Sequence, residues 1–190
     1  MLQTRDGDTY EIRVAAEPKA DEAGTLSDAE RVENLASDWM LDAKSPEVAK
    51  AAREIAGAAA TPWEKANKLY TWVFETLEKT SVLSVPTAVE VLRAKQGDCN
   101  EHTVLFVALA RAAGVPARVA IGLVYSDEVG GFGYHAWPEV FIGHWIPMDP
   151  TLGQPIADAT HIKILNGGIA EWGRLMGYIG QAKIEVLGVE

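Results

Sequence analysis

The sequence contains one cysteine, Cys99, among its 190 residues. A lone cysteine cannot form an internal disulfide, and it cannot supply the set of thiolates that most structural zinc sites use. Folds held by internal disulfides and multi-thiolate zinc sites are therefore excluded. Two interpretations of Cys99 remain, a buried inert side chain or a reactive thiol, and its sequence neighbours have to decide between them.

Long apolar runs and clusters of basic residues are also missing. No apolar stretch approaches the roughly 18 residues of a membrane-spanning helix, and the polar start, MLQTRDGDTYEIRV, is unlike a signal peptide. The 17 Lys and Arg are scattered among 27 Asp and Glu, for a net charge of −10. A surface that binds nucleic acid or anionic membrane needs concentrated positive charge, so neither partner is expected. We expect a soluble chain, either cytosolic or excised from a longer extracytoplasmic protein.

The overall composition is that of an ordinary globular protein, with 48% hydrophobic and 23% charged residues. This length suits one domain with a substantial core. The alternating stretch Thr9–Ala16 predicts a short strand, and a polar connection follows it. Because a lone strand has nothing to pair with, we interpret residues 1–24 as a strand and linker at the edge of a larger protein, and residues 25–190 as the main domain.

Helix-start signals dominate the first half of the main domain. A capping box places Ser, Thr or Asp before a helix and Glu three positions later, and four such pairs occur: Ser27 with Glu30, Thr61 with Glu64, Thr87 with Glu90, and Asp98 with Glu101. Ser45-Pro46 predicts a fifth start, with proline at the first helical position. The spacing after Ser27 predicts one apolar face made of Val32, Leu35, Ala36 and Trp39.

The most apolar predicted helix begins at Asp98 and ends at Gly114, just before Pro116. Apolar residues cover much of its circumference, so we place it in the core. Cys99 falls in its first turn. The free N–H groups of a helix N-terminus stabilise a thiolate and can later hold an oxyanion, so this position favours the reactive interpretation of the thiol.

Beyond Pro116 the sequence changes to short segments rich in β-branched and aromatic residues. Three of them, ARVAIGLVYS, YHAWPEVFI and HWIPMD, predict an antiparallel meander. HIKIL and KIEVLGV are further strand candidates, with a short amphipathic piece at residues 170–178 between them. The predicted fold class is α+β, with N-terminal helices and a central Cys-bearing helix packed on an antiparallel sheet.

A nucleophilic thiol needs a base, and the base needs a partner on its other nitrogen. His135 in YHAWPEV is the candidate base and Asp149 in PMDPT the candidate partner. Because strand side chains alternate between faces, these two share a face only if the connecting loop is odd in length or bulged. A three-residue loop, 142–144, places Asp149 opposite Trp137 and diagonal to His135, whereas an unbulged two-residue turn separates them.

Four motifs follow one another in the middle third of the chain: GDCNEH, RAAGVPAR, HAWPEV and WIPMDPT. Together they resemble the transglutaminase-like superfamily and its bacterial and archaeal cysteine-protease-like members. The resemblance places the family's nucleophile at Cys99, its histidine at His135 and its aspartate at Asp149. It implies a papain-like fold, with the cysteine on a helix and the other two residues on neighbouring strands, and it makes residues 25–190 a transglutaminase-like catalytic domain.

The residues and the resemblance predict cysteine-dependent acyl transfer from a peptide or glutamine-type amide through a thioester, without a metal or organic cofactor. Hydrolysis of a peptide or protein substrate is favoured because no second amine-binding feature is visible. Three alternatives remain: a protein-glutamine transglutaminase, a non-catalytic peptide-binding module of the same fold, and a metal-binding regulator that uses Cys99, His102 and His135. The oligomeric state is left open.

Other polar and aromatic residues near these motifs have simpler interpretations. Glu101 caps its helix, and His102 is interpreted as a structural histidine that holds the helix against the sheet. Trp137 either walls the cleft or belongs to the core. His144 and His161 are expected to be exposed, and Gln96 is left outside the site because loop polarity explains it.

Overall fold

The computed structural model describes residues 2–16, 24–81, 86–127, 130–167, 171 and 183–188. The helices of this part of the chain are α1 (Asp28–Leu35), α2 (Pro46–Ala56), α3 (Pro62–Thr76), α4 (Ala88–Ala94) and α5 (Cys99–Ala112). Its strands are β1 (Leu2–Asp6), β2 (Thr9–Arg13), β3 (Glu78–Lys79), β4 (Gln96–Gly97), β5 (Ala117–Ser126), β6 (Gly131–Phe141), β7 (Trp145–Pro147) and β8 (His161–Asn166). Within these residues, no helix has both the length and the apolar character to cross a membrane.

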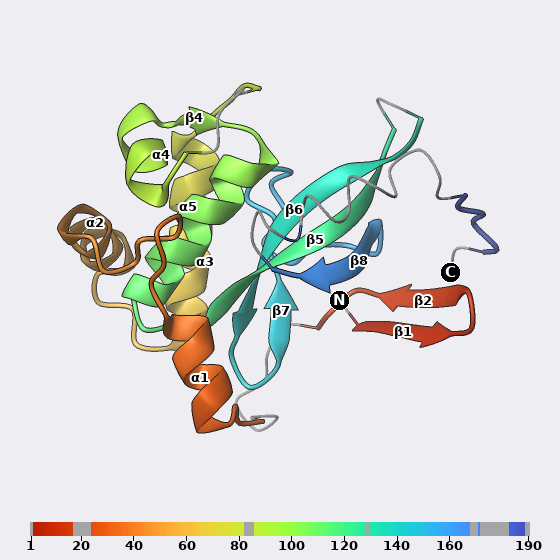
Figure 1. The fold of residues 1–190 in the computed structure, drawn as a ribbon, viewed down its shortest axis with the longest axis horizontal. Coiled ribbons are helices and arrows are strands. Elements are labelled where there is room, and N and C mark those ends of the chain that lie inside the picture. The colour runs from red at the N-terminus through yellow and green to blue at the C-terminus, as the bar shows by residue number, and fades with distance from the viewer. Residues whose placement is uncertain are drawn as a thin grey trace.

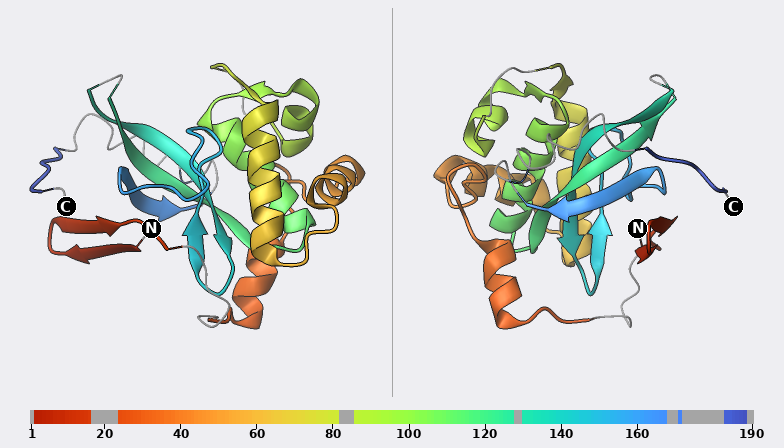
Figure 2. Two further views of the ribbon diagram at one scale, coloured as in Figure 1. Left: turned by 180° about the vertical axis from the view of Figure 1, so that it is seen from behind. Right: turned by 45° about the vertical axis from the view of Figure 1, so that its right-hand side comes forward.

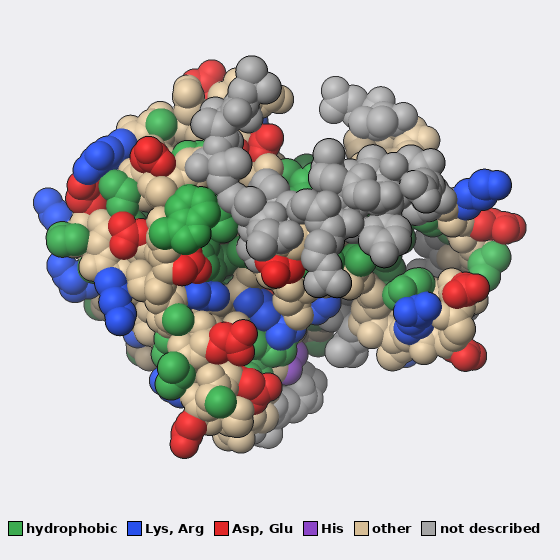
Figure 3. Space-filling model, viewed as in Figure 1, with side chains coloured by type: hydrophobic (Ala, Val, Ile, Leu, Met, Phe, Trp, Pro, Cys, Tyr) green, Lys and Arg blue, Asp and Glu red, His purple; other side chains and the backbone are tan. Residues whose placement is uncertain are grey.

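The architecture is α+β, as predicted. Helices α2, α3 and α4 surround α5 on one side, and α5 contacts β5 and β6 on the other (Figure 1). The view from behind shows α3 lying along α5, with the sheet beside the helices (Figure 2). Acidic and basic side chains are interspersed over the face drawn in Figure 3. The Cys-bearing helix is therefore the central element that joins the helical layer to the sheet.

Local capping chemistry explains where the helices begin. All four predicted capping boxes are present, and each pairs an N-cap side chain with a Glu three positions later. Ser45 stands at the N-cap of α2 with Pro46 at the next position, but its side chain makes no capping hydrogen bond. A capping box satisfies two helix-end groups within four residues, so sequence alone predicts these starts correctly.

The predicted apolar face of α1 is wrong. Val32 is 70% exposed and Trp39 is 69% exposed, whereas Asn34 is the buried residue of this helix. The helix ends at Leu35, so Trp39 lies beyond its last turn and cannot continue a helical stripe. Over only eight residues, two or three apolar side chains can match the helical period without a core beneath them.

The main sheet has the strand order β7-β6-β5-β8 and is antiparallel throughout. The predicted meander corresponds to β5, β6 and β7, and HIKIL lies in β8 on the other edge of β5. KIEVLGV is not a strand over its described residues 183–188. The apolar side chains of these residues are exposed. The alternating pattern therefore predicted a strand here wrongly, because alternation does not show that a partner strand is available. Residues 170–178 lie outside the described residues, apart from Glu171.

The N-terminal strand is not alone, which corrects the sequence interpretation. Strand β1 pairs with β2, and Asp6 stands opposite Thr9, so a two-residue turn joins the strands. Gly7 in this turn has a φ of +57°, a conformation that favours glycine. The hairpin lies beside β8, where the Gln3 amide group donates to the Lys163 carbonyl and accepts from its N–H, at 2.7 and 2.8 Å. The polar residues of β1 gave no apolar alternation to predict it.

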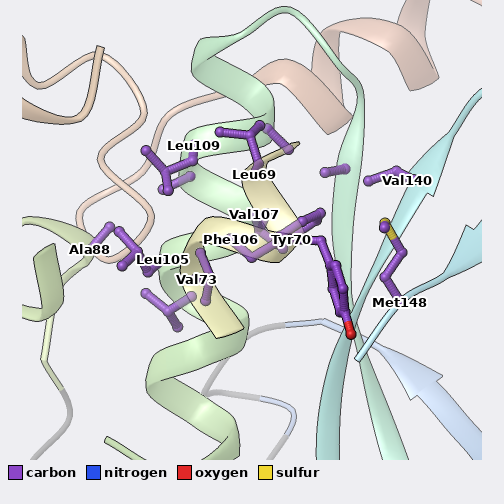
Figure 4. Close-up of a cluster of buried hydrophobic side chains, with 14 of the residues drawn as sticks. Leu69, Tyr70, Val73, Ala88, Leu105, Phe106, Val107, Leu109, Val140 and Met148 are labelled. Carbon is purple, nitrogen blue, oxygen red and sulfur yellow. The ribbon is translucent and has the colours of Figure 1, made fainter. Parts of the chain in front are cut away.

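The core fills the space between the helices and the sheet (Figure 4). Side chains of α3, α5 and the sheet meet there, and its large members include Leu69, Val73, Leu105, Phe106, Leu109, Val140 and Met148. Residues 101–110 of α5 are all buried, which confirms the prediction of a core helix. Each fully buried large side chain stabilises the fold by about 1.5–3 kcal/mol. The packing of α5 in this core therefore fixes the position of its first turn.

Gly122 of β5 lies opposite His135 and next to β8. A Cβ atom at Gly122 would lie 1.9 Å from the carbonyl oxygen of Ile162 and 3.0 Å from the Trp137 ring. We expect Gly122→Ala to lower the free energy of unfolding, measured with urea, by about 1–3 kcal/mol because backbone has to move. Gly133→Ala is the matched control, since its Cβ would meet nothing within 4 Å. Equal losses in both variants would contradict this prediction.

Candidate active site

The first turn of α5 holds Cys99 in a fixed position. Asp98 caps the helix, its side chain accepts from the Asn100 N–H at 2.9 Å, and the Glu101 carboxylate accepts from the Asp98 N–H at 2.8 Å. A Cβ atom at Gly97 would lie 2.2 Å from the Glu101 Cβ, so glycine leaves the space that this capping contact needs. Glu101 therefore has the predicted capping role, and Cys99 is the first residue of the helix, half-buried.

The hairpin between β6 and β7 brings His135 and Asp149 together. Phe141 pairs with Trp145, so the loop has three residues, as the site required. The same register places Asp149 opposite Trp137, and the Met148 N–H donates to the Pro138 carbonyl beside that pair. Nε2 of His135 lies 2.6 Å from Oδ2 of Asp149, and both side chains are buried. The predicted diagonal contact is confirmed.

Backbone contacts join the start of α5 to the strand that carries the histidine. The Cys99 thiol receives a backbone hydrogen bond from Ala136, the residue directly after His135. One turn further along α5, the Thr103 hydroxyl donates to the Ala136 carbonyl at 3.0 Å. Asp149 contacts Nε2 of His135, so Nδ1 is the ring nitrogen that this carboxylate does not engage. The three predicted site residues thus lie in one place.

Burial decides the protonation of the thiol. Burial raises the pKa of Cys99 to about 12, the hydrogen bond from Ala136 opposes this, and the negative charges of Asp98, Asp149 and Glu101 add to the rise. The sequence led us to expect that the helix N-terminus would favour the thiolate, whereas burial and the neighbouring carboxylates raise the pKa of this thiol. The thiol therefore needs a specific proton acceptor, since loss of its proton to water is unfavourable at neutral pH.

Asp149 is held as a carboxylate. Burial alone would raise the pKa of Asp149, but hydrogen bonds from His135 and His161, the charge of His135 and the Leu152 N–H outweigh burial and hold the pKa well below its ordinary value. Oδ2 contacts both histidines, and Oδ1 accepts from the Thr151 and Leu152 N–H groups at 2.8 and 2.9 Å. A charged, fully engaged carboxylate can orient an imidazole and stabilise its protonated form.

His161 is the residue that the sequence interpretation missed. It was expected to be exposed, but it is 0% exposed, and its Nε2 lies 3.0 Å from Oδ2 of Asp149. It begins β8, on the far side of β5 from His135, so only the folded sheet brings it to the site. The one usable sequence signal was its position at the start of an apolar strand, where a polar residue is unusual.

Trp137 belongs to the core, which is one of the two roles that the sequence left open. It is fully buried, and its ring stacks on His135 with centroids 6.0 Å apart. The ring also meets His161 edge-on, at 5.0 Å between centroids. Trp137 is thus a core residue whose ring packs against both histidines that contact Asp149.

His102 holds its own helix start. Its Nδ1 lies 2.7 Å from the Asp98 carbonyl oxygen, whereas its buried Nε2 has no hydrogen-bond partner. Burial lowers the pKa of His102, which favours the neutral ring. His102 therefore has a structural role at the N-terminus of its own helix, whereas the sequence interpretation placed that role between the helix and the sheet. Gln96 is exposed and His144 is partly exposed, away from these contacts.

One group of described residues has the donor types and spacing that could hold a metal ion, namely His135, Asp149 and His161. Their ligand atoms lie within 4.8 Å of one another. The two nitrogens already contact Oδ2 at 2.6 and 3.0 Å, and a zinc ion at about 2.1 Å from each atom would force them apart. The alternative set with Cys99 and His102 is not assembled among the described residues. The geometry is that of a hydrogen-bonded cluster.

Comparison with known proteins places the chain in context. The family model described as the transglutaminase-like superfamily matches residues 49–150. The uncharacterized proteins Rv2569c of Mycobacterium tuberculosis and Mb2599c of Mycobacterium bovis are each 28% identical over 156 residues, covering 70% of this chain and 48% of theirs. The chain thus spans about half the length of the curated relatives it matches.

Two solved structures share the fold. A "putative cysteine protease" from Cytophaga hutchinsonii has a TM-score of 0.65 and 24% identity, covering 74% of this chain and 48% of that one. The periplasmic domain of TgpA from Pseudomonas aeruginosa has a TM-score of 0.55 and 22% identity, covering 68% of this chain and 49% of that one. At these identities the likeness concerns the arrangement of helices and strands.

Proposed function

The chain belongs to the transglutaminase-like superfamily, and from this premise we propose that it is a cysteine-nucleophile acyl-transfer enzyme. Cys99 is the nucleophile, His135 the general base and acid, and Asp149 the residue that orients His135. The observation that carries the proposal is the 2.6 Å contact between His135 and Asp149, held next to the strand residue that binds the Cys99 thiol. A half-buried thiol, an imidazole ring and a carboxylate engaged by hydrogen bonds, in this order, match what thiol-dependent acyl transfer needs.

The reaction begins with proton transfer from the Cys99 thiol to Nδ1 of His135. The thiolate attacks the carbonyl carbon of the amide, and the carbonyl oxygen takes the negative charge. When the C–N bond breaks, Nδ1 returns its proton to the leaving amine, and a thioester remains on Cys99. Asp149 stays ionised throughout and stabilises the protonated ring of His135.

One backbone group of the first turn is available for the oxyanion. The N–H groups of Asn100, Glu101 and His102 all donate to Asp98, through its side chain or its carbonyl. This leaves the Cys99 N–H, which lies beside the attacking sulfur and at the positive end of the helix. We assign it as an oxyanion donor, because such donors act when they point to where charge develops.

We propose water as the acceptor of the acyl group, which makes the reaction hydrolysis of a peptide or protein amide. The solved relative named as a "putative cysteine protease" supports this choice. Transfer to a lysine-type amine is the second candidate, because the same thioester serves both reactions. A peptide-binding module without catalysis is the alternative that the filled triad disfavours.

The test is to trap the acyl-enzyme. The protein is incubated with a pool of glutamine-containing and other peptides, quenched in acid, and analysed by mass spectrometry for an acyl group on Cys99. We expect an adduct in the wild type and none in Cys99→Ala, and free acid product without added amine. Added methylamine identifies a transamidase if amide product replaces the acid. Peptide binding without any adduct or product would reject the enzyme proposal in favour of a binding module.

A further inference from the structure

We propose that His161 is a positioning residue that holds the Asp149 carboxylate and shares its negative charge with His135. This inference rests on the proposed function, since it concerns the residue that orients the proposed base. His161 does not touch the reacting atoms. It acts through Asp149, and its effect on the reaction is exerted on the proton that His135 exchanges.

The position of His161 suits this role. Its side chain is fully buried at the start of β8, and its ring lies 5.7 Å from the His135 ring between centroids. Trp137 packs edge-on against it. A buried imidazole in such a place must satisfy its nitrogens with neighbouring groups, because water does not reach them.

The hydrogen bonds at Asp149 show what His161 supplies. Oδ1 accepts from two backbone N–H groups, so its direction is fixed by the turn that follows β7. Oδ2 accepts from His135 at 2.6 Å and from His161 at 3.0 Å. His161 therefore occupies the acceptor atom on which the base depends, and the two rings compete for the same lone pairs.

The other nitrogen of His161 faces a second carboxylate. Nδ1 lies 3.3 Å from Oδ1 of Asp158 and 3.5 Å from the Thr160 hydroxyl oxygen. That hydroxyl donates to the same Asp158 oxygen, so it has no proton to give to Nδ1. A neutral ring would leave one nitrogen lone pair facing a carboxylate oxygen, whereas a protonated ring donates to both Asp149 and Asp158. The geometry points to a His161 that donates from both nitrogens.

The charged groups that contact His161 are Asp149 and Asp158, with His135 across the ring contact. A second positive donor on Oδ2 weakens the hold of Asp149 on the protonated form of His135. His135 then releases its proton to the leaving amine more readily, while the carboxylate keeps its direction. Replacement of His161 should therefore affect two quantities in opposite directions. The thiolate–imidazolium pair should become more stable, whereas turnover should fall.

The test compares His161→Gln with His144→Gln, a matched change at a partly exposed histidine. The alkaline limit of Cys99 alkylation by iodoacetate, an anion that the protonated His135 attracts, is expected to move to higher pH in His161→Gln, because Asp149 then holds the protonated His135 more firmly. Turnover of a peptide substrate is expected to fall about tenfold, which is the loss typical when a residue that orients another site residue is replaced. His144→Gln should leave both unchanged.

Other outcomes overturn the inference. If alkylation and turnover of His161→Gln fall together without a shift of the pH limit, His161 only supports the fold. If neither changes, it has no role. Failure of the proposed function is distinct, because Cys99 alkylation in the wild type would then be independent of His135.

A measurement on the wild type covers the case in which His161→Gln does not fold. ¹⁵N NMR of the imidazole groups at the pH of activity is expected to show protons on both nitrogens of His161. An Nδ1 of His161 without a proton would overturn the proposal that His161 shares the negative charge of Asp149 with His135.

Discussion

Replacing His135 by alanine is expected to slow alkylation of Cys99 by iodoacetamide about 10²- to 10⁴-fold at neutral pH. Burial raises the pKa of the thiol to about 12, so a Cys99 thiol that can lose its proton only to water is almost wholly protonated under these conditions. In the proposed mechanism the imidazole of His135 accepts this proton, so the thiolate of the wild type is expected to form as one half of an ion pair. The measurement is the second-order alkylation rate as a function of pH.

The shape of the pH profile is as informative as the rate. The wild type is expected to reach a plateau well below pH 9, whereas His135→Ala should keep rising about tenfold per pH unit, because its thiol ionises only to water. His144→Ala is the matched control, since this histidine lies on the loop between β6 and β7 away from Asp149. Equal rates in wild type and His135→Ala would remove the basis of the enzyme proposal and favour a peptide-binding module.

The sequence predicted those parts of the fold that depend on nearby residues. Capping boxes act within four residues, and the apolar circumference of α5 requires burial whatever covers it. The hairpin between β6 and β7 was predictable because strand alternation and loop length determine which side chains share a face. The contact between His135 and Asp149 follows from that arithmetic for a three-residue loop, which the structure has. The sequence left a two-residue turn open, so it predicted the contact only on that condition.

Features that depend on distant segments were predicted wrongly or not at all. β1 is polar, so no apolar alternation indicated its local pairing with β2. Its contact with β8 through Gln3 joins residues 160 positions apart. Residues 183–188 alternate like a strand but have no partner strand among the described residues. Alternation shows that a segment suits a sheet, but an available sheet edge decides whether it pairs.

The same distinction applies to the site. His161 reaches Asp149 only because β8 returns to the edge of β5, and no spacing rule connects them. Burial by neighbouring elements raises the pKa of Cys99, and the position of Cys99 at a helix N-terminus did not indicate this burial. The sequence therefore indicated the three residues of the proposed triad, whereas the burial of Cys99 and the contact of His161 with Asp149 depend on the folded environment.

Replacing Asp149 by alanine is expected to lower the free energy of unfolding at neutral pH by about 3–5 kcal/mol. The carboxylate accepts four hydrogen bonds, two from buried histidines and two from backbone N–H groups of the turn after β7. Its loss leaves these donors without an acceptor in a site that water does not enter. Urea unfolding measures the change, and Asp8→Ala is the control, because the exposed Asp8 should contribute within about 0.5 kcal/mol.

The stabilising effect of Asp149 also has a defined pH dependence. Its pKa is lower in the folded protein than in the unfolded chain, so as the pH falls the unfolded chain binds a proton first. The advantage of the wild type over Asp149→Asn is therefore complete above the unfolded value of about 4, and it shrinks as the pH falls toward the lower folded value. Asp8→Asn should show no comparable loss. A difference that stays constant from pH 7 to pH 2 would mean that Asp149 stabilises the fold by its shape and not by its charge, and the ion pair with His135 would lose its support.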